Sequence, residues 1–300
     1  MDIPISKHFL GCISRIEEAD HSSSHFNFNL ELELSTTEYH KLMQAVKVVN
    51  SYIKDSQMFS IVSWNYKDFT RTINNYLHAF DQKNEKFITE FPIDVNLNRV
   101  FLNLLSSVRS YFDFMDRKIK REHGEESDIY SYYTNYRHAE FDTKVSFRFL
   151  EKLRNYSQHK GFPIGSFVIS KGSADGTPKM QSIGINMFFL RDELLLGFDW
   201  GKIKPDIEAM ATEIPVLPHV ASYLNSINVI HINTMYRILA TLHVSANYVI
   251  EACAKISCLE GVPVIFEVES EMKDFNKINH IGIPVNFCNE IINRSEAFSS

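Results

Sequence analysis

Residues 141–163 read FDTKVSFRFLEKLRNYSQHKGFP, and the interpretation of the whole chain depends on this stretch. Its apolar side chains recur every three or four residues, which predicts an amphipathic helix with one buried face. Gly161 and Pro163 are expected to end that helix. The predicted buried stripe consists of Val145, Phe149, Leu153 and Tyr156, and the polar helix end consists of Arg154, Asn155, Ser157, Gln158 and His159.

The chain before this stretch is predicted to be mainly helical. Apolar and polar residues alternate over 26–34, which is the period of a strand with one buried face. Ser35, followed by Glu38 three positions later, is a helix-start signal, and the apolar stripe after it continues to about Gln57. Further helices are expected over 66–82, 95–121 and, more briefly, 130–136.

The chain after Pro163 changes to the period of strands. The dipeptide Asp175-Gly176 predicts a hairpin turn. The β-branched run 227–234 weakens an otherwise helical pattern. Residues 1–25 end in a polar HSSSH segment, which is assigned to a loop. Strands are expected over 164–170, 180–190, 194–198, 262–269 and 281–287, a long helix over 220–256 and a loose tail over 293–300.

These patterns predict an α+β fold, in which an antiparallel helical bundle is followed by an antiparallel β-rich region. We place the boundary so that 1–163 form the bundle with an N-terminal strand and 164–300 form the β-rich region with one long helix. Two further arrangements stay open. The long helix 220–256 can return to the bundle, and the strand 26–34 can join the late sheet.

Composition limits the class of protein. A chain of 300 residues that is 44% hydrophobic can bury a substantial core. Its formal net charge of −6 disfavours nonspecific coating of long nucleic acid but leaves room for a small basic cleft. The four scattered cysteines lack metal-binding spacing and are expected to be reduced thiols. Because the sequence shows neither a signal peptide nor an apolar run of about 20 residues, we expect a cytoplasmic protein without a membrane partner.

The polar helix end contains the groups that RNA cleavage requires. Arg154 offers a fixed charge and donors shaped for phosphate, His159 can exchange a proton near neutral pH, and Asn155 can orient a reacting group. Five residues of helix rotate by about 500°, so Arg154 and His159 point about 140° apart. Either the helix unwinds before Gly161, or two copies meet across a two-fold axis. The sequence predicts no cofactor and no metal site, because the common nucleotide, dinucleotide and zinc motifs are absent.

The segment LRNYSQHKG (153–161) resembles the Arg-polar-x(4–6)-His signature of HEPN domains, the higher eukaryotes and prokaryotes nucleotide-binding superfamily. The long predicted helix 95–121 ahead of it is similar to the helix order of that family, and the resemblance covers about 95–163. It implies a dimeric, HEPN-like antiparallel helical bundle. Many members are metal-independent ribonucleases of toxin–antitoxin, abortive-infection or CRISPR systems. The resemblance implies that Arg154, Asn155 and His159 are catalytic, in a site composed from both copies.

The resulting functional prediction is a homodimeric endoribonuclease that cleaves RNA to 2′,3′-cyclic phosphate ends without a metal. Such a protein would act as a toxin or antiviral-defence effector, and an antitoxin or regulatory protein is a further candidate partner. Two alternatives stay open. The chain can be a non-catalytic HEPN-like module that binds a partner protein or a nucleotide. The motif can also be a plain helix end, in which Arg154 pairs with Glu151 or another acid.

Other residues are assigned supporting roles. Asp113 and Asp116 are candidates to orient Arg154 or His159. The tyrosines of 130–136 can stack on bases or pack the chain against the bundle. Three histidines recur every 12 residues on the late helix, a spacing that does not place them on one face: His219, His231 and His243. The candidate RNA contacts are Lys118, Lys120, Arg121, Tyr156 and Lys160. For the basic residues at 118–121, the alternative is a helix end that only faces solvent.

Overall fold

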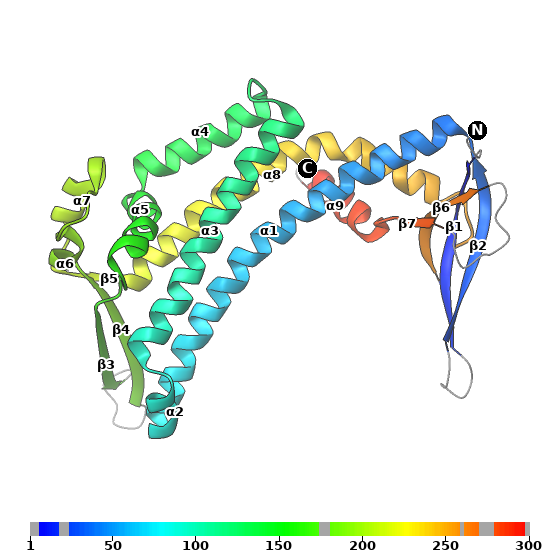
Figure 1. Cartoon of the computed structure of the whole chain (residues 1–300). Coiled ribbons are helices and arrows are strands. Elements are labelled where there is room, and N and C mark those ends of the chain that lie inside the picture. Colours follow the sequence, from blue (N-terminus) through cyan, green and yellow to red (C-terminus); the bar gives the residue numbers. More distant parts are fainter. Residues whose placement is uncertain (1–5, 18–23, 174–180, 259–260, 270–278, 298–300) are drawn as a thin grey trace. The chain divides into compact units, whose positions relative to one another are not determined.

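The protein has an α+β fold in which long helices accompany two small antiparallel sheets (Figure 1). This confirms the expected fold class at that level. Among the residues that the structure describes, one sheet has four strands, in the order β2 (Ser24–Leu34), β1 (Ser6–Glu17), β6 (Val262–Glu269) and β7 (Asn279–Gly282). The other has three, in the order β3 (Ser166–Ser173), β4 (Gln181–Leu190) and β5 (Glu213–Pro215). The computed structural model describes residues 6–17, 24–173, 181–258, 261–269 and 279–297.

The chain divides into two compact units, one made of 57–234 and the other of 1–56 together with 235–300. Helices α1 (Thr36–Asp81) and α8 (Val216–Cys253) each contribute a part to both units. The boundary expected after residue 163 falls inside the first unit. Both arrangements that the sequence left open are found, because the start of α8 joins the helices of that unit and β2 belongs to the late sheet.

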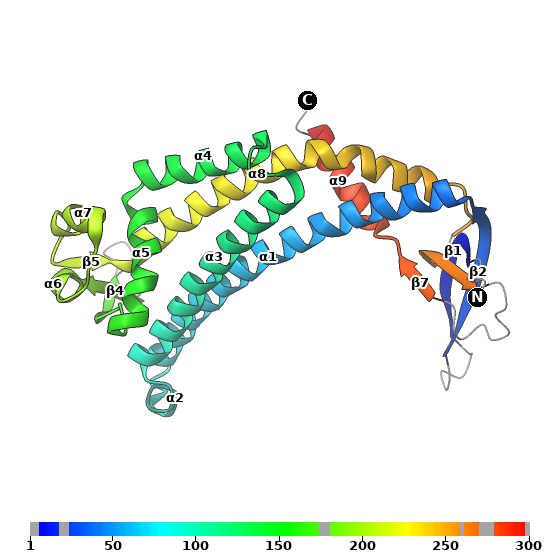
Figure 2. The same cartoon turned by 45° about the horizontal axis from the view of Figure 1, so that its top comes forward.

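The helices that carry the predicted site lie in the unit of 57–234. A short helix, α2 (Glu85–Glu90), precedes α3 (Ile93–His123). Helix α3 packs against both α4 (Asp128–Thr143) and α5 (Val145–Lys160), and the three are seen together in Figure 2. Its apolar residues recur at helical spacing and form a continuous buried face: Leu97, Phe101, Leu104, Val108, Phe112 and Met115.

The three-stranded sheet packs on these helices. Phe189 of β4 is fully buried and contacts the rings of Phe101 in α3 and Phe149 in α5. The start of α8 packs there too, since Tyr223 contacts Phe147. The sheet consists of β3 (Ser166–Ser173), β4 (Gln181–Leu190) and β5 (Glu213–Pro215), and the connection from β4 to β5 contains α6 (Arg191–Leu195), η2 (Gly201–Ile203) and α7 (Lys204–Glu208).

The four-stranded sheet belongs to the other unit. Its strands β1 and β2 pair with a register shift at Leu10/Gly11, where a Cβ on Gly11 would lie 1.9 Å from the carbonyl oxygen of Asn29. Only glycine fits that close approach. A disulfide joins Cys12 and Cys258, whose Cα atoms are 5.8 Å apart. The elements are β1 (Ser6–Glu17), β2 (Ser24–Leu34), β6 (Val262–Glu269), β7 (Asn279–Gly282) and α9 (Val285–Ala297).

Several predicted helices are longer than expected. The helix expected to stop near Gln57 and the helix expected from Tyr66 are one helix, α1. The residues of α1 include neither Gly nor Pro, and β-branched residues cost only a few tenths of a kcal/mol each. Residues 227–234 likewise contain neither Gly nor Pro, and helix α8 continues through them despite their β-branched side chains. The predicted start of α1 is confirmed, because the Ser35 amide donates to Glu38 at 3.0 Å and the Glu38 amide to Ser35 at 3.3 Å.

Several strand predictions and the cysteine prediction are wrong. Residues 6–17 form strand β1, where no strand was expected, and Leu194–Leu195 end helix α6 where a strand was expected. The strand expected over 281–287 ends at Gly282, and α9 replaces both its second half and much of the loose tail. Two of the four cysteines form the disulfide. The hairpin turn predicted at Asp175-Gly176 lies outside the described residues.

Candidate functional site

Helix α5 presents the predicted motif on a regular helix. The helix runs from Val145 to Lys160, and its apolar face is buried. It ends at Gly161, which has φ of 121°, a conformation that favours glycine over residues with a Cβ. Unwinding before Gly161 was one of the two expected ways to complete the site, and it is absent because α5 stays helical to Lys160.

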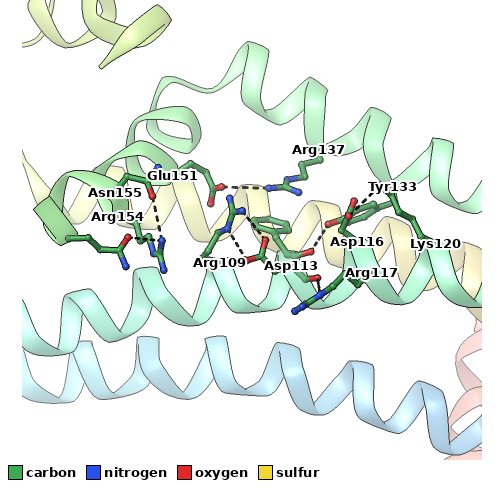
Figure 3. Close-up of polar contacts among 12 residues, drawn as sticks. Arg109, Asp113, Asp116, Arg117, Lys120, Tyr133, Arg137, Glu151, Arg154 and Asn155 are labelled. Carbon is green, nitrogen blue, oxygen red and sulfur yellow. Dashed lines mark hydrogen bonds and ion pairs between the residues drawn. The ribbon is translucent and has the colours of Figure 1, made fainter. Parts of the chain in front are cut away.

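The side chains of the motif hold one another along α5. The Nη1 of Arg154 donates to Gln158 Oε1 at 2.8 Å and lies 3.5 Å from Asn155 Oδ1 (Figure 3). Among the described residues, the buried Nε of Arg154 has no hydrogen-bond partner. Asn155 and His159 are exposed. One guanidinium donor is thus uncommitted, and the amide and the imidazole are accessible.

One copy of the chain does not aim Arg154 and His159 at the same atom. Because α5 is helical through both residues, their five-residue separation keeps them about 140° apart around the axis. The predicted pairing of Arg154 with Glu151 is also absent, because Glu151 pairs with Arg137 instead. The motif in one chain is therefore a set of accessible polar groups and not a closed catalytic constellation.

The two aspartates proposed to orient the motif have other partners. Asp113 forms an ion pair with Arg109 at 3.0 Å, and its backbone carbonyl accepts from Arg117 (Figure 3). Asp116 accepts from the Tyr130 hydroxyl at 2.9 Å and lies 3.6 Å from Lys120 Nζ. Neither carboxylate contacts Arg154 or His159, so the structure assigns both of them to α3 and its contact with α4.

The basic end of α3 is neutralised by nearby acids. Lys118 is only 5% exposed and lies 3.5 Å from Glu122, which also pairs with the exposed Arg121. Lys120 lies 3.0 Å from Glu125 and also lies over the Tyr130 ring. The predicted RNA contacts Lys118 and Lys120 are thus structural, and the structure does not place them beside the motif.

The two remaining predicted RNA contacts differ from each other. Tyr156 is buried and stacks on Trp200, with ring centroids 5.5 Å apart. Burial raises the pKa of its hydroxyl. Lys160 is exposed at the end of α5, beside the motif. Tyr156 is therefore a core residue, whereas Lys160, like Arg121 at the distant end of α3, remains accessible to a ligand.

A cleft in the same unit receives one residue of the motif. It has a volume of about 580 Å³, and we call it the α5 cleft because α5 lines it together with α3, α4 and 200–203. Asn155 lines it, whereas Arg154 and His159 do not. Its charged residues are Arg109, Asp116, Arg137, Arg148, Glu151, Lys152 and Lys202, which are five cations and two carboxylates.

A partly buried network holds two residues that line the α5 cleft, Arg137 and Glu151. Glu151 accepts from the Tyr223 hydroxyl at 2.5 Å, and its other oxygen lies 3.7 Å from Arg137, whose guanidinium lies over the Phe112 ring. Burial raises the pKa of Tyr223 well above its ordinary value, and the nearby Glu151 carboxylate raises it further. The tyrosine therefore stays protonated as a donor to Glu151, and this arrangement fixes Arg137 toward the cleft.

A second ion pair holds another cation of the cleft, Arg148. Arg148 donates two hydrogen bonds to Asp206, at 2.6 and 3.0 Å, and further bonds to the carbonyl oxygens of Phe141 and Asp142. The bonds from Arg148 lower the pKa of Asp206. All three nitrogens of this guanidinium are thus engaged in holding α5 to α7 and to the end of α4.

Sequence patterns did not identify this cleft. Its residues come from four elements, and no local spacing brings Arg109, Lys152 and Lys202 together. The one available signal was the pair Arg137-His138 next to the tyrosines. Of those tyrosines, Tyr133 is fully buried and packs α4 against α3. This agrees with the alternative that these tyrosines pack the chain against the bundle.

The three histidines of α8 lie in separate environments. His219 hydrogen-bonds Ser146, and burial lowers its pKa. His231 bonds Tyr111, and His243 bonds Ser295. They form no common site, as their spacing predicted.

Comparisons with protein-family models, with curated proteins and with solved structures found no match for the chain. Across the described residues, none of the helices combines the length and the apolar character that a bilayer span needs. Within the same residues, His, Cys, Asp and Glu form no group of three or more that could hold a metal ion.

Proposed function

We propose that the protein is an endoribonuclease of HEPN type that acts as a dimer through Arg154, Asn155 and His159. The observation that carries the proposal is the exposure and the hydrogen bonding of the motif side chains on α5. Asn155 and His159 are exposed, and the Nε of Arg154 has no partner among the described residues. A helix end used only for capping would have these groups bonded to its own last carbonyls.

The proposed roles follow from the chemistry of each group. His159 removes the proton from the ribose 2′-hydroxyl or protonates the leaving oxygen, since an imidazole titrates near neutral pH. Arg154 stabilises the negative charge that develops on the phosphorus oxygens. Asn155 orients the ribose. The products would end in 2′,3′-cyclic phosphate, because the 2′-oxygen is the nucleophile.

The geometry of α5 supports the participation of a second copy. Arg154 and His159 of one chain point about 140° apart, so one chain cannot direct both at one phosphate. A two-fold axis at the exposed end of α5 would oppose the two motifs and let each chain complete the site of the other. This arrangement also agrees with the HEPN resemblance of residues 95–163.

A non-catalytic HEPN-like module is the competing proposal, and one observation favours it. Arg154 is already bonded to Gln158 within its own helix, so the motif in a single chain is stable without a substrate. In this case the chain binds a partner protein or a nucleotide and cleaves nothing.

Cleavage of RNA by purified protein in EDTA tests the two proposals. Wild type should yield products with cyclic phosphate ends, and His159→Ala should lower the rate at least about 100-fold, the usual size of a lost acid–base catalyst. The matched control is His78→Ala, which removes another exposed histidine in the last turn of a helix. If wild type cleaves no RNA, or if His159→Ala cleaves as fast as wild type, the nuclease proposal is wrong.

Mixing two inactive variants tests the shared site. Arg154→Ala and His159→Ala should each be inactive alone. Equilibrated together, they form some dimers in which one chain supplies Arg154 and the other supplies His159. Partial recovery of cleavage is expected if the two residues act across the axis, and no recovery would show that they act within one chain or not at all.

A further inference from the structure

The α5 cleft differs in charge from the rest of the chain. Five cations and two carboxylates line it, whereas the whole chain has a formal net charge of −6. A concentration of positive charge in a concave site of an acidic protein attracts an anionic ligand. We infer that the α5 cleft binds single-stranded RNA, with phosphates on Lys152 and Lys202 and an unpaired base on Phe141. This inference rests on the proposed ribonuclease and adds the site that binds its RNA substrate.

The cations of the cleft differ in how far they are committed. Arg148 is fully engaged by Asp206 and two carbonyl oxygens, and Arg109 is paired with Asp113. Within the described part of the chain, by contrast, Lys152 and Lys202 form no ion pair. The Nζ of Lys152 lies over the Phe198 ring, 5.7 Å from its centroid, and Lys202 is exposed. These two ammonium groups are therefore the ones available to phosphate oxygens.

An aromatic platform stands beside these cations. Phe141, near the end of α4, is 41% exposed although it lines the cleft. The other large rings of the lining are committed elsewhere, because Trp200 is buried against Tyr156 and Tyr130 is bonded to Asp116. An exposed ring within a cationic groove is the arrangement that proteins use to stack unpaired bases.

The cleft is continuous with the proposed catalytic motif through Asn155. This residue follows Arg154 on α5 and lines the cleft, one turn of helix after Glu151 and close to Lys152. A strand bound in the cleft would therefore reach the motif end of α5. The cleft would hold the nucleotides next to the scissile bond, and Arg154 and His159 would act on the bond itself.

The size of the cleft favours a single strand. A volume of about 580 Å³ is within the range of small-ligand sites, roughly 300–1,000 Å³, and suits one or two nucleotides. A duplex keeps its bases stacked inside the helix and offers no ring to Phe141. A free mononucleotide has the same chemistry as one nucleotide of the strand, but it lacks the phosphates that would contact the motif.

Binding is measured apart from cleavage, so that the two proposals can fail separately. All proteins carry His159→Ala, and fluorescence anisotropy follows a labelled single-stranded RNA of about 10 nucleotides, within the usual range of site sizes. The test variant is Lys152→Gln with Lys202→Gln. Its matched control is Lys67→Gln with Lys86→Gln, which removes the same charge from exposed positions of α1 and α2.

The expected results are quantitative. The test variant should bind about tenfold or more weakly than the control, and the slope of log affinity against log salt should fall by about 1.4, or 0.7 for each lost phosphate contact. Phe141→Ala should weaken binding at least about fivefold and leave that slope unchanged. AMP and duplex RNA should compete far more weakly than the single strand.

Three results would overturn the inference. The His159→Ala protein binds no RNA, or the test variant binds as tightly as its control, or AMP competes as well as the strand. The last of these would assign the cleft to a free nucleotide. Each result is independent of the cleavage assay, so a protein that binds RNA as expected but never cleaves it would refute the nuclease and leave the binding site in place.

Discussion

Asn98 ties the segment after the motif helix to α3, and its replacement tests how that segment is held. The side chain is fully buried. Its amide donates to the carbonyl oxygen of Ile164 at 3.0 Å, and its oxygen accepts from the Ile164 amide at 3.0 Å. Asn98→Ala removes both bonds and leaves two buried backbone groups without this partner.

The expected cost follows from those two groups. Each buried polar group that loses its partner costs about 1–3 kcal/mol. Alanine is the better helix former by up to about 0.7 kcal/mol, which offsets a small part of that cost. We expect Asn98→Ala to lower the free energy of unfolding by about 2–5 kcal/mol. Asn98→Asp keeps the acceptor for the Ile164 amide but loses the donor, so its effect at neutral pH adds the burial of a charge and should be no smaller.

Urea denaturation followed by circular dichroism measures the change. The matched control is Asn74→Ala on α1, an exposed position where the free energy should move by no more than about 0.5 kcal/mol. A loss below about 1 kcal/mol for Asn98→Ala would show that other groups or water replace the two bonds, and the reasoning would be refuted.

Two further predictions concern charge and thiols. The lowered pKa of Asp206 means that its bonds with Arg148 stabilise the folded chain at neutral pH, and that this stabilisation is lost as the pH falls below the ordinary value of 3.8. Asp206→Asn should lack this part of the acid sensitivity in urea titrations at pH 7 and pH 3, and an unchanged profile would contradict it. Thiol titration of the unfolded, unreduced protein should find two free thiols, Cys253 and Cys288, and four after reduction. Because burial raises both thiol pKa values to about 11, the folded protein should react slowly with iodoacetamide at pH 8, and fast labelling would count against the burial of these cysteines.

Local patterns predicted the helices well and the short strands unevenly. The capping residues Ser35 and Glu38, the apolar stripe of α3 and the Gly161 stop are signals within a few residues of each other, and each is found as expected. Strand β1 was missed because its residues have no clear alternation, and it is specified instead by pairing with β2 and β6. Residues 281–287 were expected to be a strand and 293–300 a loose tail, although the buried Cys288 and Ile291 make 285–297 a packed helix.

The candidate site was predicted in part. The motif residues were identified from adjacent positions, and the rotation of about 140° between Arg154 and His159 followed from helix geometry alone. The roles given to Asp113, Asp116, Lys118, Lys120 and Tyr156 were not found, because each side chain has another partner. Asp113, Lys118 and Lys120 pair with charged residues four or five positions away along the chain. Asp116 and Tyr156 contact Tyr130 and Trp200, which are distant in sequence.

The sequence by itself determined the helical order, the end of α5 at Gly161 and the types of group presented there, since all of these depend on spacing within one helix. Only the tertiary structure decided that Glu151 pairs with Arg137, that Arg148 is held by Asp206 and that Lys152, Lys202 and Phe141 share a cleft with Asn155. These contacts join α3, α4, α5 and the segment that follows β4. Side chains more than one helix apart meet only when the whole unit packs, and no local pattern encodes which of them will find a partner.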